Sequence, residues 1–235
     1  MKKKTSLIIG GSKGNGHEIV KELKKRGDFV INISRSVNKT ADKNISINLN
    51  NPNYLNNIRK IIKDTKINSL IFSQKYRGKD RDEEMQVMVK SSIDIINLLK
   101  NNFSKFASVV FLSTVGIIRI ADQEVNYYVS QSSRNILAKY YAVKFAKNNV
   151  RFNSVLPSRL IKKENKNFFK KNKKERNLLT KINPLKTIPT SKDTAMLVEF
   201  LTSDKSKMIN GESISVDGGL NLYGQEELIK KLLFK

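Results

Sequence analysis

The stretch Leu7-Ile8-Ile9-Gly10-Gly11-Ser12-Lys13-Gly14-Asn15-Gly16 decides how this chain is expected to fold. An apolar run ends at spaced glycines, and a helical pattern follows in which Ile19, Val20 and Leu23 share one face. Glycines let a backbone approach a phosphate closely, and the free N–H groups at a helix start attract an anion. The order of strand, glycine turn and helix therefore predicts a cradle for a pyrophosphate, although a plain tight turn could carry the same glycines.

Length and composition indicate one soluble domain. The chain has 235 residues, 39% of them hydrophobic, which is enough for a sizeable core. It contains no cysteine, so disulfides and thiolate metal sites are excluded, and no His/Asp/Glu cluster suggests another kind of metal site. No apolar run is long enough for a signal peptide or a membrane span, so we expect a cytoplasmic protein without a membrane partner.

The formal net charge of +24 permits two interpretations. A basic protein can bind nucleic acid or another polyanion. Here, however, the lysines are spread along the whole chain among many asparagines and isoleucines, which is typical of a genome-wide compositional bias. We favour the bias and do not expect nucleic acid as a partner. Lys162 to Arg176 is the densest basic block.

Strand-like apolar runs alternate with helical patterns along the chain. This alternation is typical of a parallel sheet covered by helices on both faces. We therefore predict an α/β fold, a single doubly wound domain over residues 1–235 with about seven strands. The predicted strands are Thr5–Ile9, Phe29–Ser34, Ile45–Leu49, Ser69–Ser73, Ser108–Ser113, Val150–Val155 and Ser213–Val216.

One connection between the strands differs from the others. Residues 158–190 are rich in lysine and lack strand signals, although their apolar residues are spaced for short amphipathic helices. An insertion of this length is more often a substrate loop or lid than a linker. The other connections are predicted to be helices, running from the glycine turn to Arg26, over Asn53–Asp64, Asp82–Lys100 and Asn126–Asn148, and from Ser191 onward.

Five separated stretches, in the same order, resemble those of the short-chain dehydrogenase/reductase family. Members of this family are oxidoreductases with a single Rossmann-fold domain. The family's glycine motif corresponds to Ile9–Gly16, where all three glycines are kept and Ile9 replaces a threonine. The other four stretches contain an active-site serine, a tyrosine, an Asn-x-Val-x-Pro segment and a closing Asp-Gly-Gly: Ser113, Tyr127, Asn153–Pro157 and Asp217–Gly219.

The resemblance implies hydride transfer between a nicotinamide cofactor and a carbonyl or alcohol. It implies that Ser113 holds the substrate oxygen and that Tyr127 acts as general acid or base. A lysine four residues after the tyrosine would assist it, but that position is Gln131. Counting from Tyr128 instead gives Ser132. A neutral glutamine can hydrogen-bond a ribose, but it cannot supply the positive charge that favours a tyrosinate.

The resemblance also implies a choice of cofactor. An acidic residue at the end of the second strand would favour NAD, but Ser34 and Arg35 stand there. With Lys13 in the glycine turn, Arg35 suits the 2′-phosphate of NADP, so we favour NADP over NAD. Asn48 takes the place of an aspartate that usually contacts adenine. The positions assigned to the cofactor are Gly10, Ser12, Lys13, Gly14, Asn15, Gly16, Ser34, Arg35, Asn48, Leu49, Ser73, Gln131 and Pro157.

These departures leave alternatives for the function. The first is an NADP-dependent oxidoreductase that works with Ser113 and Tyr127. The second is a dinucleotide-binding protein that has lost catalysis and acts as a regulatory or oligomer partner; Gln131 favours it, as does the loss of the family's relay asparagine, whose position is Val89 or Lys90. A polyanion-binding protein is the third, and the net charge is its only support.

A finer resemblance concerns the substrate and the assembly. Tyr140–Lys144, Lys162–Asn165 and Gly218–Glu226 resemble a bacterial subgroup found with surface-polysaccharide and nonulosonic-acid sugar pathways. This implies a small-molecule substrate that is a sugar or nucleotide sugar, and a role in polysaccharide biosynthesis. Family members form homodimers or homotetramers through two long helices, which the apolar stripes over Met85–Leu99 and Ile136–Phe145 permit.

Overall fold

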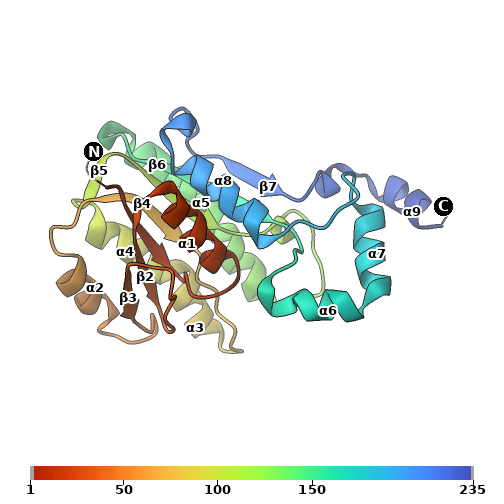
Figure 1. The fold of residues 1–235 in the computed structure, drawn as a ribbon, viewed down its shortest axis with the longest axis horizontal. Coiled ribbons are helices and arrows are strands. Elements are labelled where there is room, and N and C mark those ends of the chain that lie inside the picture. Colours follow the sequence, from red (N-terminus) through yellow and green to blue (C-terminus); the bar gives the residue numbers. More distant parts are fainter. Residues whose placement is uncertain (1–2, 234–235) are drawn as a thin grey trace.

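A computed structural model, which describes residues 3–233, has a seven-stranded sheet at its centre (Figure 1). All neighbouring strands are parallel, and their order is β3-β2-β1-β4-β5-β6-β7. The chain therefore builds outward from β1 in one direction and from β4 in the other. This confirms the predicted doubly wound α/β fold. The strands are β1 Thr5–Ile9, β2 Phe29–Ser34, β3 Lys43–Ser46, β4 Ile67–Phe72, β5 Phe103–Leu112, β6 Arg151–Pro157 and β7 Ser213–Val216.

Helices cover both faces of this sheet because each buried strand is apolar on both sides. Leu7 and Ile8 are neighbours in β1, yet they belong to two separate cores, since successive strand side chains point to opposite faces. The first core lies under α2 (Tyr54–Ile62), α4 (Ser91–Leu99) and α5 (Val125–Lys144). The second lies under α1 (Gly14–Arg26) and α8 (Ser191–Leu201), whose ribbons lie side by side in Figure 1.

The clearest differences from the prediction concern two predicted elements and one helix that was not predicted. The third strand is Lys43–Ser46 rather than Ile45–Leu49, because the chain leaves the ladder after Ser46 while Ile47 and Leu49 stay buried against the core. The predicted helix over Asp82–Lys100 is divided into α3 (Arg81–Met85), a π-helical turn (Gln86–Lys90) and α4. A helix that was not predicted, α9 (Gln225–Leu233), lies near the C-terminus.

The insertion over residues 158–190 contains α6 (Lys166–Lys171) and α7 (Lys173–Ile182), the short helices that its spacing predicts. Its two ends meet, because the Ile161 amide donates to the Pro189 carbonyl (2.9 Å) and the Ser191 amide donates to the Ile161 carbonyl (3.1 Å). Figure 1 shows both helices standing beyond the sheet, toward α9. We refer to residues 162–189 as the lid segment.

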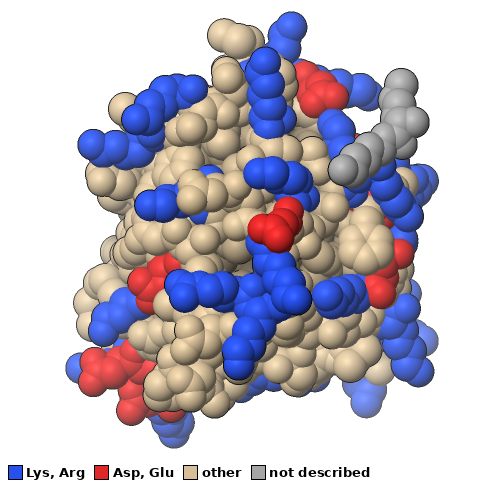
Figure 2. Space-filling model, turned by 90° about the vertical axis from the view of Figure 1, so that its left-hand side faces the viewer, with Lys and Arg blue, Asp and Glu red and all other residues tan. Residues whose placement is uncertain are grey.

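The positive charge is not gathered in one patch on the face that Figure 2 shows. Lys and Arg side chains are scattered over that face, with Asp and Glu among them. None of the helices within residues 3–233 is long and apolar enough to cross a membrane.

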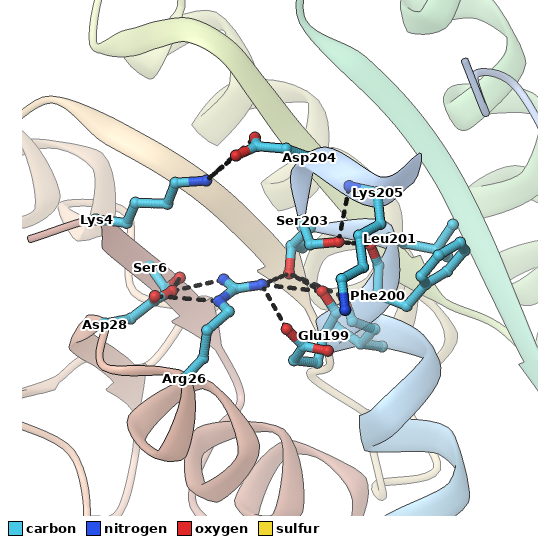
Figure 3. A network of polar contacts seen from close by, with 12 residues as sticks. Lys4, Ser6, Arg26, Asp28, Glu199, Phe200, Leu201, Ser203, Asp204 and Lys205 are labelled. Carbon is cyan, nitrogen blue, oxygen red and sulfur yellow. Dashed lines mark hydrogen bonds and ion pairs between the residues drawn. The ribbon is translucent and has the colours of Figure 1, made fainter. Parts of the chain in front are cut away.

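A polar network joins α1 to α8 where β1 and β2 begin (Figure 3). The buried Asp28 carboxylate accepts hydrogen bonds from the Ser6 hydroxyl and from the Arg26 guanidinium, which also donates to the Glu199 carbonyl (2.9 Å) and the Thr202 hydroxyl (2.9 Å). Because both charges are satisfied by several partners, this network holds the two helices in register. It lies at the ends of the strands opposite to the cavity described next.

Candidate functional site

A cavity of about 360 Å³ lies at the carboxyl ends of β1, β2 and β4. In open α/β sheets this crevice, beside the point where the strand order reverses, is where ligands bind. All but three of the residues assigned to the cofactor line it; Gly16, Gln131 and Pro157 do not. Those that do are Gly10, Ser12, Lys13, Gly14, Asn15, Ser34, Arg35, Asn48, Leu49 and Ser73.

The glycine turn forms the floor of this cavity, and its shape depends on its glycines. Gly10 has a φ of 87°, and a Cβ there would lie 2.5 Å from the Gln74 backbone. A Cβ on Gly16 would overlap the Gly10 carbonyl oxygen, so both positions accept no side chain. Asn32 and Asn38 hold the turn from below, because they bond the Gly11 amide (3.0 Å) and the Gly11 carbonyl (2.6 Å).

This floor fits the pyrophosphate of a dinucleotide. Gly14 opens α1, so the N–H groups of the first turn have no partner within the helix, and Gly14 and Asn15 line the cavity at the positive end of the helix dipole. The Asn15 side-chain oxygen is buried without a partner among the described residues, but it is an acceptor, so only the amide NH2 of this side chain could donate to a phosphate. His17, one turn further, is not in the cavity. Its Nδ1 contacts Asn38 (3.1 Å), and burial, with Lys21 nearby, lowers its pKa.

Cations that sequence reasoning did not assign also line the cavity. Lys75 and Arg77 follow β4, and Lys162 reaches in from the lid segment. Lys75 is exposed at the cavity, and its pKa is lowered to about 8 because nearby protein atoms partly desolvate the amine and because Lys162, Arg134 and Arg77 are also positive. An anionic ligand would relieve this repulsion. In the family that the sequence resembles, Asn-Asn-Ala-Gly follows the fourth strand, where this chain has Phe72-Ser73-Gln74-Lys75, and the lysine in that stretch was the available signal.

The end of β2 carries no carboxylate. The Ser34 hydroxyl donates to the Ser36 carbonyl (2.6 Å), and Arg35 is exposed beside it at the cavity. Asn48 lies on the same side and accepts a hydrogen bond from the Asn50 amide (3.2 Å). Arg35 therefore presents a positive charge where the adenosine half of a dinucleotide would lie.

Hydroxyl groups meet at the end of β5, but not in the expected arrangement. Ser113 is fully buried, and its hydroxyl donates to the Gln131 carbonyl (2.9 Å). Thr114 is half-buried, and its Oγ1 accepts from the Gly116 amide (3.1 Å). A Cβ on Gly116 would lie 3.4 Å from Thr114 Oγ1 and 3.7 Å from Tyr127 Cε1. The threonine hydroxyl and the tyrosine ring thus flank the same glycine, whereas the serine is turned inward.

Gln131 and Arg134 lie below this point, on α5. Gln131 is buried, and its side-chain oxygen has no partner among the described residues. Arg134 is completely buried, and its guanidinium donates to the carbonyls of Leu112 and Gln74 at the ends of β5 and β4. Burial lowers its pKa to about 9. Arg134 therefore fixes the strand ends, and its charge is directed at carbonyls rather than at the Tyr127 hydroxyl.

The fold, the glycine floor and the strand-end residues define a dinucleotide-binding oxidoreductase of the single-domain α/β type. A family model described as Enoyl-(Acyl carrier protein) reductase matches residues 72–221. The chain belongs to the short-chain dehydrogenase/reductase family. The fold of this family binds a nicotinamide dinucleotide.

Two relatives match almost the whole chain. A tropinone reductase homolog from Arabidopsis thaliana is 26% identical over 247 residues, covering 94% of each chain. A 3-oxoacyl-[acyl-carrier-protein] reductase, FabG, from Rickettsia conorii is 27% identical over 237 residues, covering 92% of this chain and 96% of the relative. These matches, each over more than nine tenths of both chains, agree with the family that the model over residues 72–221 shows.

Solved structures share the fold. A short chain dehydrogenase family protein from Francisella tularensis superposes with a TM-score of 0.82 at 26% identity, covering 94% of this chain and 100% of the other. ElxO, solved with NADP bound, superposes with a TM-score of 0.80 at 19% identity, with the same coverage.

Proposed function

We propose that this protein is an NADP-dependent oxidoreductase that acts on a carbonyl or alcohol substrate. The observation that carries the proposal is the cavity itself, a glycine floor with Arg35, Lys13 and no carboxylate at the end of β2. Two basic side chains there suit a 2′-phosphate. The NADP bound to ElxO, a protein of the same fold, is consistent with this choice.

The chain's own residues would position the substrate and move a proton. The nicotinamide, when bound, supplies or accepts the hydride. Tyr127 would exchange a proton with the substrate oxygen; its hydroxyl forms no hydrogen bond with the described residues, so it is available. We assign Thr114 to hold that oxygen, in place of or together with Ser113, because its hydroxyl flanks the same glycine as Tyr127.

The proposed substrate class rests on the lid segment and on the finer sequence resemblance. The lysines of the segment favour an anionic substrate, and the resemblance to the sugar-pathway subgroup favours a sugar, so an anionic sugar or nucleotide sugar is the proposed substrate. NADPH oxidation across a panel of sugars, nucleotide sugars and simple carbonyls tests this class. A preference for uncharged carbonyls would contradict it.

Arg35→Asp is expected to weaken NADPH binding about 10-fold to 100-fold, because a charge-assisted hydrogen bond is replaced by repulsion. NADH, which has no 2′-phosphate, should bind as tightly as before or more tightly. Fluorescence titration of both cofactors measures this. Lys39→Asp is the matched control, since Lys39 is exposed nearby and does not line the cavity. An equal loss of affinity for NADH and for NADPH would show that Arg35 does not bind the 2′-phosphate.

A second candidate function is a dinucleotide-binding protein without catalysis. Gln131 favours it, because no cation follows Tyr127 at the family's position. Val89, at one of the two possible positions of the relay asparagine, lines a different cavity, between the π-helical turn and α5. This candidate function predicts that the protein binds NADPH but does not oxidise it, whichever substrate is added.

Gln131→Lys distinguishes the two candidates. A lysine here would favour the tyrosinate, and we expect turnover near neutral pH to rise about tenfold, which corresponds to about 1.4 kcal/mol. Gln131→Met, neutral and of similar length, is the control and should give no gain. Steady-state NADPH oxidation measures both variants. Unchanged turnover in Gln131→Lys, with cofactor binding intact, would contradict the expectation.

The outer face of α5 supports a proposal on assembly. Val129, Ile136, Tyr140 and Val143 are exposed and spaced along one face of the helix. Covering such a stripe with a second copy would bury apolar area. We propose a homodimer or homotetramer through this helix, and light scattering on the purified protein measures it.

A further inference from the structure

A carboxylate from the lid segment lies at the glycine turn, where α1 begins. Glu164 is exposed at the start of this segment, and its Oε1 accepts a hydrogen bond from the Gly14 amide (2.9 Å). Gly14 is the first residue of α1, so this amide is one of the free donors at the helix start. The same donor is the one that a bound pyrophosphate would use.

The local structure of the lid segment presents Glu164 there. Asn165 accepts a hydrogen bond from the Lys162 amide (2.7 Å) and donates to the Leu160 carbonyl (3.0 Å). These two bonds fix the turn that the chain makes as it leaves β6. Lys162 comes close to the same glycine, since its Cδ would lie 3.5 Å from a Cβ on Gly14. The aliphatic stem of Lys162 and the carboxylate of Glu164 thus both lie beside Gly14.

Glu164 is charged in this position. Partial burial opposes ionisation, but hydrogen bonds from its own amide and from Gly14, with Lys162 and Arg77 nearby, lower the pKa of its carboxyl. It is therefore a carboxylate at neutral pH. An anion already occupies the donor at the start of α1, and its negative charge offsets the surrounding cations.

The lid segment is attached in a way that allows Glu164 to leave. The segment is anchored by the buried Phe169 and by the Asn183 side chain, which donates to the Asp217 carbonyl, so the part that can move is the Glu164 side chain. The hydrogen bond to Gly14 is solvent-exposed, and exposed contacts of this kind break easily.

We propose that Glu164 is an internal competitor of the cofactor and that Lys162 is a further cofactor-binding residue. In the free protein Glu164 holds the Gly14 amide. A pyrophosphate displaces the carboxylate and takes over both Gly14 and Lys162. Cofactor binding thereby moves the Glu164 side chain at the start of the lid segment, which the proposed function assigns to the substrate. The inference rests on the proposed function for the identity of the cofactor.

Glu164→Gln and Glu164→Ala are expected to bind NADPH about tenfold more tightly than the unmodified protein, since the competing charge is gone. Inorganic pyrophosphate should likewise bind the two Glu164 variants more tightly than it binds the unmodified protein. Isothermal titration calorimetry measures both ligands. Glu226→Gln is the matched control, because it removes an equal charge from an exposed position on α9 and should leave both affinities unchanged. Lys162→Met should weaken both ligands.

The two ligands separate this inference from the proposed function. If NADPH fails to bind any variant while pyrophosphate binds the Glu164 variants more tightly, the competitor stands and the proposed function fails. If NADPH binds the unmodified protein and the Glu164 variants with the same affinity, the proposed function stands and the proposal that Glu164 competes with the cofactor is overturned. Weaker binding of either ligand by the Glu164 variants, or no binding of either ligand to any protein, would also overturn it.

Discussion

Tyr127→Phe is expected to lower the rate of NADPH oxidation by roughly 10²–10⁴-fold, the range that a lost general acid or base produces. The substitution removes only the hydroxyl, and the ring keeps its place beside Gly116 and its edge contact with Tyr128 (5.5 Å between centroids). NADPH affinity should therefore stay within a factor of about two of the unmodified protein, because the tyrosine does not line the cofactor cavity. Stopped-flow or steady-state absorbance measures the rate, and fluorescence titration measures the affinity.

Tyr128→Phe is the matched control for this experiment. The Tyr128 hydroxyl is occupied by the backbone of Ala121, where it accepts from the amide (2.6 Å) and donates to the carbonyl (2.7 Å). It can therefore hold the loop before α5, but it is not free to take a proton from a substrate. We expect Tyr128→Phe to keep most of the turnover. Full activity in Tyr127→Phe, or a larger loss in Tyr128→Phe, would show that the proton comes from elsewhere.

Gly16→Ala is expected to weaken NADPH binding by about 100-fold, which corresponds to about 2.7 kcal/mol. The added methyl group would overlap the Gly10 carbonyl oxygen and lie 2.9 Å from Gly11 Cα. Both neighbours are backbone atoms, so the start of α1 must move away from the glycine turn. The amides that face the phosphates would then lose their alignment. Titration with NADPH measures the loss.

The same variant should also reduce the free energy of unfolding, by about 1–3 kcal/mol, because overpacking forces backbone shifts. Urea unfolding and circular dichroism show whether the fold persists at the temperature of the titration. Gly224→Ala is the control, since a Cβ there meets no atom within 4 Å. It should change neither binding nor stability. Normal NADPH affinity in Gly16→Ala would show that close approach of α1 to the turn is not needed.

Much of the fold could be predicted from the sequence, because apolar periodicity reports burial directly. All seven strands were found in order, since each is an apolar run between turns or helices. The third strand was misplaced for the same reason. Ile45, Ile47 and Leu49 are all buried, but only Ile45 lies in the ladder. Periodicity cannot separate a strand from an extended segment that covers the core.

The candidate site was predictable only where one short stretch forms it. The glycine turn and the end of β2 are such stretches, and their residues do line the cavity. Ser113 and Thr114 are adjacent hydroxyl residues, and which of them turns inward depends on the exact end of β5. Tyr127, Ser113, Gln131 and Thr114 remain predictions until variants are assayed.

Site residues that come from distant parts of the chain were not assigned, because no local sequence pattern indicates that they lie close together. Lys75 follows β4, while Lys162 and Glu164 follow β6, and the sheet alone brings them to one cavity. Arg134 lies three residues beyond Gln131 on α5, but its burial and its bonds to two strand-end carbonyls give it a positioning role. Recognising this role needs the packing of α5 against the sheet to be known.

The central claim is that the cavity at the end of β1 holds NADP. Fluorescence titration of the purified protein with NADPH and with NADH tests it most directly, because it depends on neither the substrate nor catalysis. We expect saturable binding of NADPH that is at least about tenfold tighter than that of NADH. Absence of saturable binding of either cofactor would contradict the claim, and tighter binding of NADH would contradict the assignment of Arg35 and Lys13 to the 2′-phosphate.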